Sequence, residues 1–406
     1  MKKRFIYIVF ALAAFGVNAQ SLEDYLREAE LNSPKIQALE LRYNIAKEKV
    51  NEVNTLPNTT IGAGYFVSEP ETRTGAQRAK FSVSQMLPWF GTITTRENYA
   101  SSMAETEYAE IVIAKRKLAL SVAQSYYKLY GVQAKQKVLK ENIELLKTYE
   151  TLALTSVEVG KASAVDVLKL QIRQNELQQQ KEVLEQTYLA EQAVFNNLLH
   201  RDESVGVEVV DEMDIPANEP IFNKDDLSLN PELLKYDQLY ESVTQSELLN
   251  QKANAPSFGI GLDYISVSER DDMVFSDNGK DIVMPMVTFS VPIFNNKFRS
   301  TTKQNELRQK EIELQKEERL NVLENAYANA ISQRNQARIA HQTQAKNLKQ
   351  AKDAEEILIK NYETGTIDFN DVLDIQELQL KFQTNQIQSV QLYYLQSAII
   401  NYLINK

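Results

Sequence analysis

Two long runs without glycine or proline, separated by one glycine, constrain this chain most. Residues 297–362 contain neither residue type, and nor do residues 366–406. Gly365 lies between the runs, and a glycine between two helical patterns is typical of a helix end in the left-handed conformation. Asp368 and Asn370 are the candidate caps of the following helix. This pattern predicts the tip of a long antiparallel helical hairpin.

The same tip occurs earlier in the chain, around Gly160. Two copies of one motif indicate a duplicated structural unit. We therefore expect two repeats, residues 20–215 and 216–406, each built as helix, strand hairpin, long helix, tip and helix. The matching positions are Gly160 and Gly365, Asp166-Val167-Leu168 and Asp371-Val372-Leu373, and Asn196-Asn197-Leu198 and Asn401-Tyr402-Leu403.

The N-terminus has the pattern of a secretory signal peptide. Lys2, Lys3 and Arg4 precede an apolar run over residues 5–15, and Val17-Asn18-Ala19 follows as a small-residue cleavage site. We expect residues 1–19 to be removed. The alternative, a membrane anchor, is disfavoured because the apolar run is too short to span a bilayer.

Composition excludes several classes of function. The chain has no cysteine, which excludes disulfides, thiolate metal sites, a cysteine nucleophile and a lipid-anchored N-terminal cysteine. Without the three basic residues of the signal peptide, 42 of the 45 Lys and Arg residues remain against 55 Asp and Glu, a net charge of −13. This acidity argues against nucleic acid as a partner.

Each repeat contains two segments with the period-two alternation of β-strands. In the first repeat they cover residues 58–68 and 79–87. In the second, the strand after Pro256 copies the first, and the last strand covers residues 282–291. Pro285 interrupts this last strand, so we expect a bulge there or a later start.

Four strands of about ten residues each, with aromatic residues near their ends, are typical of an outer-membrane barrel. A small soluble β-sandwich is the alternative. Four strands cannot close a barrel, and open edges are not tolerated in lipid, so the chain would share its barrel with copies of itself. The residues expected at the lipid or headgroup belt are Tyr65, Trp89, Tyr264 and Phe294.

Together, the signal peptide, the duplicated unit, the proline-bounded strand hairpins and the glycine-tipped helical hairpins resemble the TolC family of outer-membrane efflux proteins, the outer-membrane factors of tripartite efflux systems. The tip sequence, residues 362–374, is the most specific part of the resemblance. The resemblance implies a mostly α chain with a small β part, and a homotrimer with a shared 12-stranded barrel continued by a periplasmic α-helical barrel. It also implies a periplasmic adaptor and an inner-membrane pump as partners, in the outer membrane of a Gram-negative bacterium.

The resemblance further implies roles for residues of the tips. Asp371 and Asp374 fall where the family has an acidic pore constriction, and an acidic ring favours cations. Asp166 and Tyr362 fall at gate contacts. Ile367 stands where the best-known members carry an arginine, so the resting lock is expected to differ here. The residues expected at the tips and in adaptor docking are Gly160, Lys161, Gly365, Thr366 and Ile367.

No pattern indicates an enzyme, a cofactor or a metal site. His200 at a predicted helix end favours a capping role, and His341 is expected on a solvated helix face. Two hypotheses stay open: a passive exit duct with metal ions or drugs as cargo, and a secreted structural or adhesive coiled-coil protein. Extraction from the outer membrane by detergent distinguishes them.

Overall fold

The computed structural model describes residues 21–161, 163–218, 223–272, 274–293, 295–364, 366–367 and 369–404. The predicted signal peptide, residues 1–19, lies outside the described residues, as do Phe294, Gly365 and Asp368. The described chain forms two compact units. The tip unit comprises residues 21–33, 116–218 and 327–402, and the sheet unit comprises residues 34–115, 223–326 and 403–404. Each unit takes segments from both predicted repeats.

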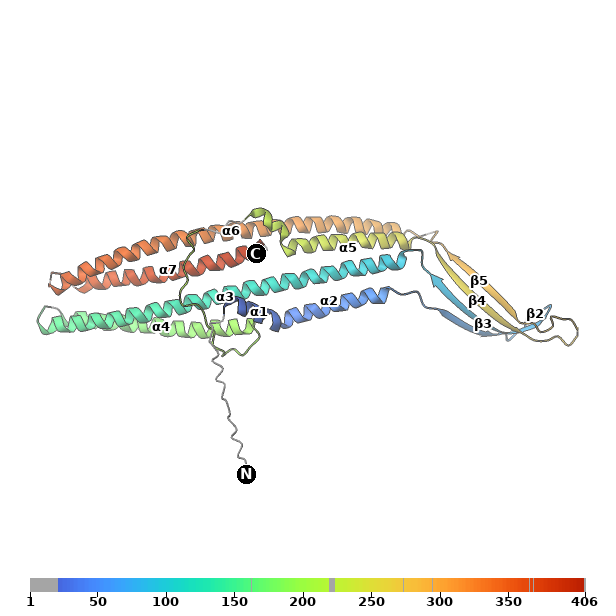
Figure 1. The fold of residues 1–406 in the computed structure, drawn as a ribbon, viewed down its shortest axis with the longest axis horizontal. Coiled ribbons are helices and arrows are strands. Elements are labelled where there is room, and N and C mark those ends of the chain that lie inside the picture. Colours follow the sequence, from blue (N-terminus) through green and yellow to red (C-terminus); the bar gives the residue numbers. More distant parts are fainter. Residues whose placement is uncertain are drawn as a thin grey trace, which may run out of the picture. The chain divides into compact units, whose positions relative to one another are not determined.

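The tip unit consists of helices and one extended connecting segment (Figure 1). Its first helix begins with a capping box, in which Ser21 and Asp24 satisfy each other's backbone N–H groups. Two helices of 67 residues, each about 100 Å long at 1.5 Å per residue, have their second halves here. The helices are α1 (Leu22–Asn32), α3 (Thr92–Glu158), α4 (Ala164–Leu198), α6 (Lys297–Glu363) and α7 (Phe369–Leu403).

Helix α3 continues through Gly131 without a break. A Cβ atom at this position would lie 2.6 Å from the side chain of Gln391 on α7. Glycine therefore leaves room for the Gln391 amide against α3, at the cost of about 1 kcal/mol of helix propensity.

The interior of the tip unit contains one apolar cluster near α1 and a second near the tips. In the first, the Tyr25 and Phe195 rings meet edge to face with centroids 5.0 Å apart. Between α3 and α7 lies a buried amide layer. Gln376 Nε2 donates to Asn142 Oδ1 at 2.9 Å, and Asn142 Nδ2 donates to Gln383 Oε1 at 3.0 Å. Buried polar layers of this kind fix the register of packed helices.

The sheet unit combines helices with one antiparallel sheet. Pro231 occupies the first turn of its helix behind the cap Asn230. Its elements, besides the first parts of α3 and α6, are α2 (Pro34–Val53), β1 (Thr60–Tyr65), β2 (Glu71–Thr72), β3 (Gly75–Leu87), η1 (Lys224–Leu229), α5 (Pro231–Ala253), β4 (Ser257–Val267) and β5 (Ile282–Ser290).

Within the described ranges, none of the helices combines the length and the apolar character that crossing a membrane requires.

The main sheet has the strand order β1-β3-β4-β5, and the short β2 pairs with the first residues of β3 (Figure 1). The central pair β3–β4 joins the hairpin of one repeat to that of the other, with Phe81 opposite Tyr264. In the described part of the chain, β1 and β5 each pair on one side only. The sheet of a single chain is therefore open at both edges.

Two details of the sequence interpretation are wrong. Pro285 makes no bulge: it pairs with Leu262 in an unshifted register. Because β5 is an edge strand, a residue without an N–H can face its unpaired side. The irregularity lies in β3, between Gln77 and Ala79. Asn370 is not a cap either, since α7 begins one residue earlier, at Phe369.

Candidate functional site

The first tip reverses the chain between α3 and α4. Gly160 has φ of 72°, as predicted for a left-handed helix end. The N–H of Lys161 bonds to the carbonyl of Ser156 at 2.8 Å, which closes the helix. Helix α4 then starts with a capping box between Ser163 and Asp166. The buried Asp166 carboxylate, predicted to be a gate contact, thus accepts a bond from the Ser163 N–H at 3.3 Å within its own tip.

The second tip closes α6 with an equivalent hydrogen bond. The N–H of Thr366 bonds to the carbonyl of Asn361 at 3.0 Å, five residues back, as Lys161 does at the first tip. The Thr366 hydroxyl adds a second bond to the same carbonyl at 2.8 Å. Ile367, which follows, packs against an apolar cluster. Ile367 therefore contributes to packing at the second tip.

Aromatic rings hold the two tips together. Tyr362, 5% exposed, meets Phe369 edge to face with centroids 4.8 Å apart. Tyr149 of α3 packs on the same Phe369 at 5.9 Å. Its hydroxyl donates to the Glu355 carboxylate, and burial together with this bond raises the Tyr149 pKa. Residues of α3, α4, α6 and α7 all join this cluster, so the two hairpins share one core.

Polar contacts also link the hairpins, and sequence reasoning missed them. Lys169 Nζ of α4 donates to Asn370 Oδ1 of α7 at 2.6 Å. One turn further along α4, Arg173 lies 3.9 Å from the Glu377 carboxylate of α7. The four-residue spacing of Lys169 and Arg173 was a usable signal for one helix face, but nothing in the sequence pairs that face with α7.

Asp371 and Asp374 lie one turn apart near the start of α7, and both are exposed. Between them Val372 is fully buried in the shared core. The two carboxylates therefore lie away from the packed side of α7. Their position near the helix N-terminus favours negative charge.

The sheet unit presents one apolar face. Ile61 is 77% exposed and Val287 is 82% exposed, although both are large aliphatic residues on strands. Cross-strand register places ten exposed large apolar side chains, aliphatic and aromatic, on this face. They are Ile61, Tyr65, Phe81, Val83, Ile260, Leu262, Tyr264, Val283, Val287 and Phe289.

The opposite face of the sheet carries mostly small and polar residues on β1 and β3, and methionines (Met284 and Met286) on β5. Ser82 lies opposite Gly62 and Asp263 in the register. Asp263 is fully buried, and its carboxylate lies 2.5 Å from Lys80 Nζ. The two faces thus differ in polarity most clearly on β1 and β3, as the alternation of the sequence indicated.

The predicted belt aromatics fall into two environments. Tyr65 and Tyr264 lie on the exposed apolar face. Trp89 is half-buried and packs against Phe90 at 5.9 Å and Phe258 at 5.6 Å.

The histidines lie apart from the tips and from each other. His200 follows α4 with φ of 55°, at the helix end where sequence reasoning placed it. His341 is not on a solvated face: its side chain is 15% exposed and lies 3.2 Å from Gln386 Nε2 and 3.5 Å from Asp214. The described residues include no cluster of three His, Asp or Glu side chains suited to a metal.

Comparisons with known proteins show which family and which solved structures this chain resembles. Residues 25–199 match the family model described as "Outer membrane efflux protein". No match was found among curated protein sequences.

Solved structures match nearly the whole chain. The outer-membrane channel OprN is 16% identical, with a TM-score of 0.74 over 94% of this chain and 89% of its own. CusC, whose structures concern folding and transmembrane channel formation, is 13% identical, with a TM-score of 0.74 over 95% and 92%. The outer membrane protein VceC of Vibrio cholerae is 14% identical, with a TM-score of 0.71 over 94% and 95%. At these identities the likeness establishes the fold.

These findings confirm the predicted resemblance to outer-membrane efflux proteins. They also confirm the fold class: a mostly helical chain whose small sheet stays open within one copy, in the fold of outer-membrane channels. Such proteins are passive channels and not enzymes.

Proposed function

From the efflux-protein match of residues 25–199 and the channel fold of the chain, we propose that three copies form the passive exit duct of a tripartite efflux or secretion system. The duct lies in the outer membrane of a Gram-negative bacterium and has a large periplasmic part. It opens at the tips on docking with a periplasmic adaptor and an inner-membrane pump. Drugs and metal ions are the candidate cargoes.

The observation that carries this proposal is the open sheet with one apolar face. In lipid, every backbone N–H and C=O needs a partner, so the unpaired edges β1 and β5 require other strands. If β5 of each copy pairs with β1 of the next, three copies close a barrel of twelve strands. The apolar face then contacts lipid, and the face with Lys80 and Asp263 lines a water-filled lumen.

The apolar face also weighs against the second hypothesis, a secreted coiled-coil protein. A water-soluble protein rarely exposes so many large apolar side chains on one contiguous surface. The long helices fit either hypothesis, whereas the sheet favours the duct.

At the tips, we assign Asp371 and Asp374 to the pore constriction. Threefold symmetry would bring six exposed carboxylates around the axis, and their mutual repulsion opposes closure. Contacts between the hairpins must then hold the resting state. Tyr149 supplies a packed aromatic contact between the hairpins and Lys169 a charged one. Tyr362 packs on the same Phe369 within the second tip, and Asp166 supports the first tip through its capping box.

The turns themselves are the proposed docking surface for the adaptor. Val159, Gly160 and Lys161 are exposed at the first tip, and Thr366 at the second. Gly365 and Ile367 complete this surface in the proposal.

Fractionation and conductance test the proposal together. Protein from purified outer membranes should need detergent for extraction, and it should form ion-conducting pores in a planar bilayer. Release by high salt or carbonate without detergent, together with no conductance, would favour the coiled-coil hypothesis.

A further inference from the structure

The connecting segment, residues 203–218, turns at residues 203–205 and then continues past α1 and α3, where tyrosine hydroxyls hold one of its edges. The Tyr25 hydroxyl accepts from the Glu208 N–H at 3.0 Å and donates to the Glu208 carbonyl at 3.2 Å. The Tyr126 hydroxyl accepts from the Val210 N–H at 3.1 Å. Residues 208 and 210 thus direct their backbone groups to the same side, as alternate residues of a β-strand do.

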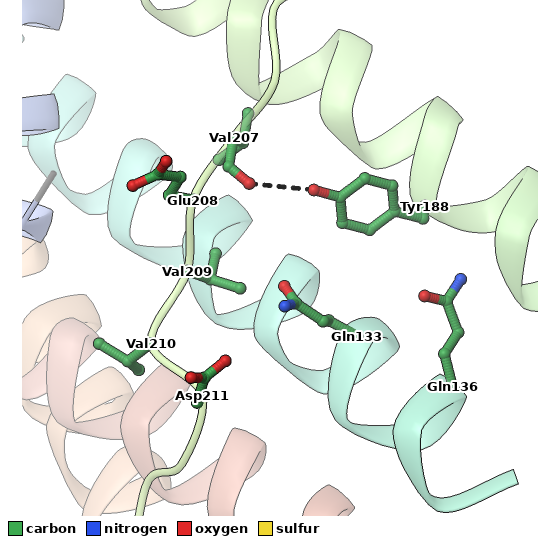
Figure 2. Close-up of a pocket in the computed structure, with 8 residues that line it drawn as sticks. All are labelled: Gln133, Gln136, Tyr188, Val207, Glu208, Val209, Val210 and Asp211. Carbon is green, nitrogen blue, oxygen red and sulfur yellow. Dashed lines mark hydrogen bonds between the residues drawn. The ribbon is translucent and has the colours of Figure 1, made fainter. Parts of the chain in front are cut away.

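The other edge of this segment faces a hollow of about 570 Å³, within the size range of ligand pockets. Figure 2 shows Tyr188, Gln133 and Gln136 across the hollow from Val207–Asp211. Only the Val207 carbonyl is engaged on this side, by the Tyr188 hydroxyl at 3.0 Å. Among the described residues, neither backbone group of Val209 has a hydrogen-bond partner, and nor does the Asp211 N–H.

A strand edge with free N–H and C=O groups is a template for another extended chain, and main-chain bonds supply the affinity. Charge identifies that chain. Glu208 and Asp211 both line the hollow, and the lining contains no basic side chain. A second copy would bring the same acidic segment, so it is a poor occupant. Residues three apart in an extended chain point to opposite faces, so Glu208 and Asp211 each offer a carboxylate to Lys or Arg on a different face of the added segment.

We propose that the free edge of residues 207–211 binds a basic, extended segment of a partner protein by strand addition. The periplasmic setting of that partner rests on the proposed function. The strand addition does not, and its test requires no transport. The Gln133 and Gln136 amides, which offer both donors and acceptors, complete the opposite wall.

Two labelled peptides of equal charge separate strand addition from simple charge attraction. The first alternates Lys and Thr over eight residues. The second has the same sequence with every backbone N–H replaced by N–CH3, so that neither edge of the peptide can donate. With the detergent-extracted protein, fluorescence anisotropy should give a Kd for the unmodified Lys-Thr peptide that is lower by about tenfold or more, because main-chain hydrogen bonds are lost with N-methylation. Equal affinities would overturn the proposal.

Matched variants locate the site. Glu208→Gln should weaken binding of the Lys-Thr peptide by about threefold to fivefold, as expected for one partly exposed ion pair. Glu203→Gln makes the same change on the same segment outside the hollow, and should leave the Kd unchanged. Equal effects of the two variants would contradict the site.

Hydrogen exchange provides a readout that does not depend on charge. The amides of Val209 and Asp211 should exchange quickly in the protein alone and slow down with the Lys-Thr peptide. If they are already protected without peptide, a second copy covers the edge and the proposal fails. Peptide binding without added protection also refutes strand addition.

Discussion

Replacing Lys169 by Met should favour the open state of the duct. Lys169 Nζ donates to Asn370 Oδ1 at 2.6 Å and links α4 of one hairpin to α7 of the other. If opening separates the two hairpins, this contact exists only in the closed state. Met keeps the length and the apolar stem of the side chain but removes the charge and the donors, so packing changes little.

The size of the effect follows from the contact. A hydrogen bond to a charged group contributes about 1.5–3 kcal/mol, and partial exposure reduces this to about 1 kcal/mol. Three copies opening together would lose about 3 kcal/mol of closed-state stability. Since about 1.4 kcal/mol corresponds to a factor of ten, the ratio of open to closed channels should rise about a hundredfold.

Single-channel recording in planar bilayers measures this ratio directly. Lys181→Met is the matched control, because Lys181 pairs with Glu185 at 2.9 Å within α4 and does not bridge the hairpins. The control should gate like the unmodified protein. An unchanged open probability for Lys169→Met, or an equal rise in both variants, would refute the assignment of Lys169 to the closed state.

Three further predictions concern the pore, the membrane belt and the shared core. Asp371→Asn with Asp374→Asn should lower cation selectivity, measured as a smaller reversal potential in a salt gradient. Asp353→Asn changes an exposed acid in the last third of α6 and should leave the selectivity unchanged; equal shifts would exclude a constriction at α7. Trp89 fluorescence should be quenched by brominated lipid, and an unquenched signal would place this residue against protein. Phe369→Ala should remove about 3–5 kcal/mol of packing in the tip core and lower the melting temperature seen by circular dichroism; an unchanged temperature would contradict the shared core.

Local patterns predicted most of the secondary structure. The long runs without glycine or proline became α6 and α7, and Gly160 took the positive φ expected of a helix end. The period-two alternation predicted both the strands and the contrast between the two sheet faces. The repeat boundaries at residues 215 and 216 stay a prediction.

Contacts between distant segments could not be read from the sequence. Lys169 looks like any solvated helix residue, and only the packing of α4 near α7 gives it a partner in Asn370. His341 was misplaced for the same reason, because the connecting segment brings Asp214 to it. The compact units mix both repeats, so a pattern that describes one repeat at a time cannot place their interfaces.

The central claim is that copies of this chain share one barrel through β1 and β5, and disulfide trapping tests it most directly. The chain has no cysteine, so a pair introduced at Ile61 and at Val283 or Val287 is the only thiol pair present. Within one chain β1 and β5 are three strand spacings apart, about 14 Å, beyond the roughly 7 Å reach of a disulfide. Any bond must therefore join two copies.

Oxidation of these variants in intact outer membranes, followed by denaturing electrophoresis without reductant, gives the answer. The shared barrel predicts that one of the two pairs produces a covalent species of three chains, which reductant returns to one. If membrane-embedded protein carrying either pair yields only single chains, β1 and β5 do not meet between copies and the shared barrel is wrong.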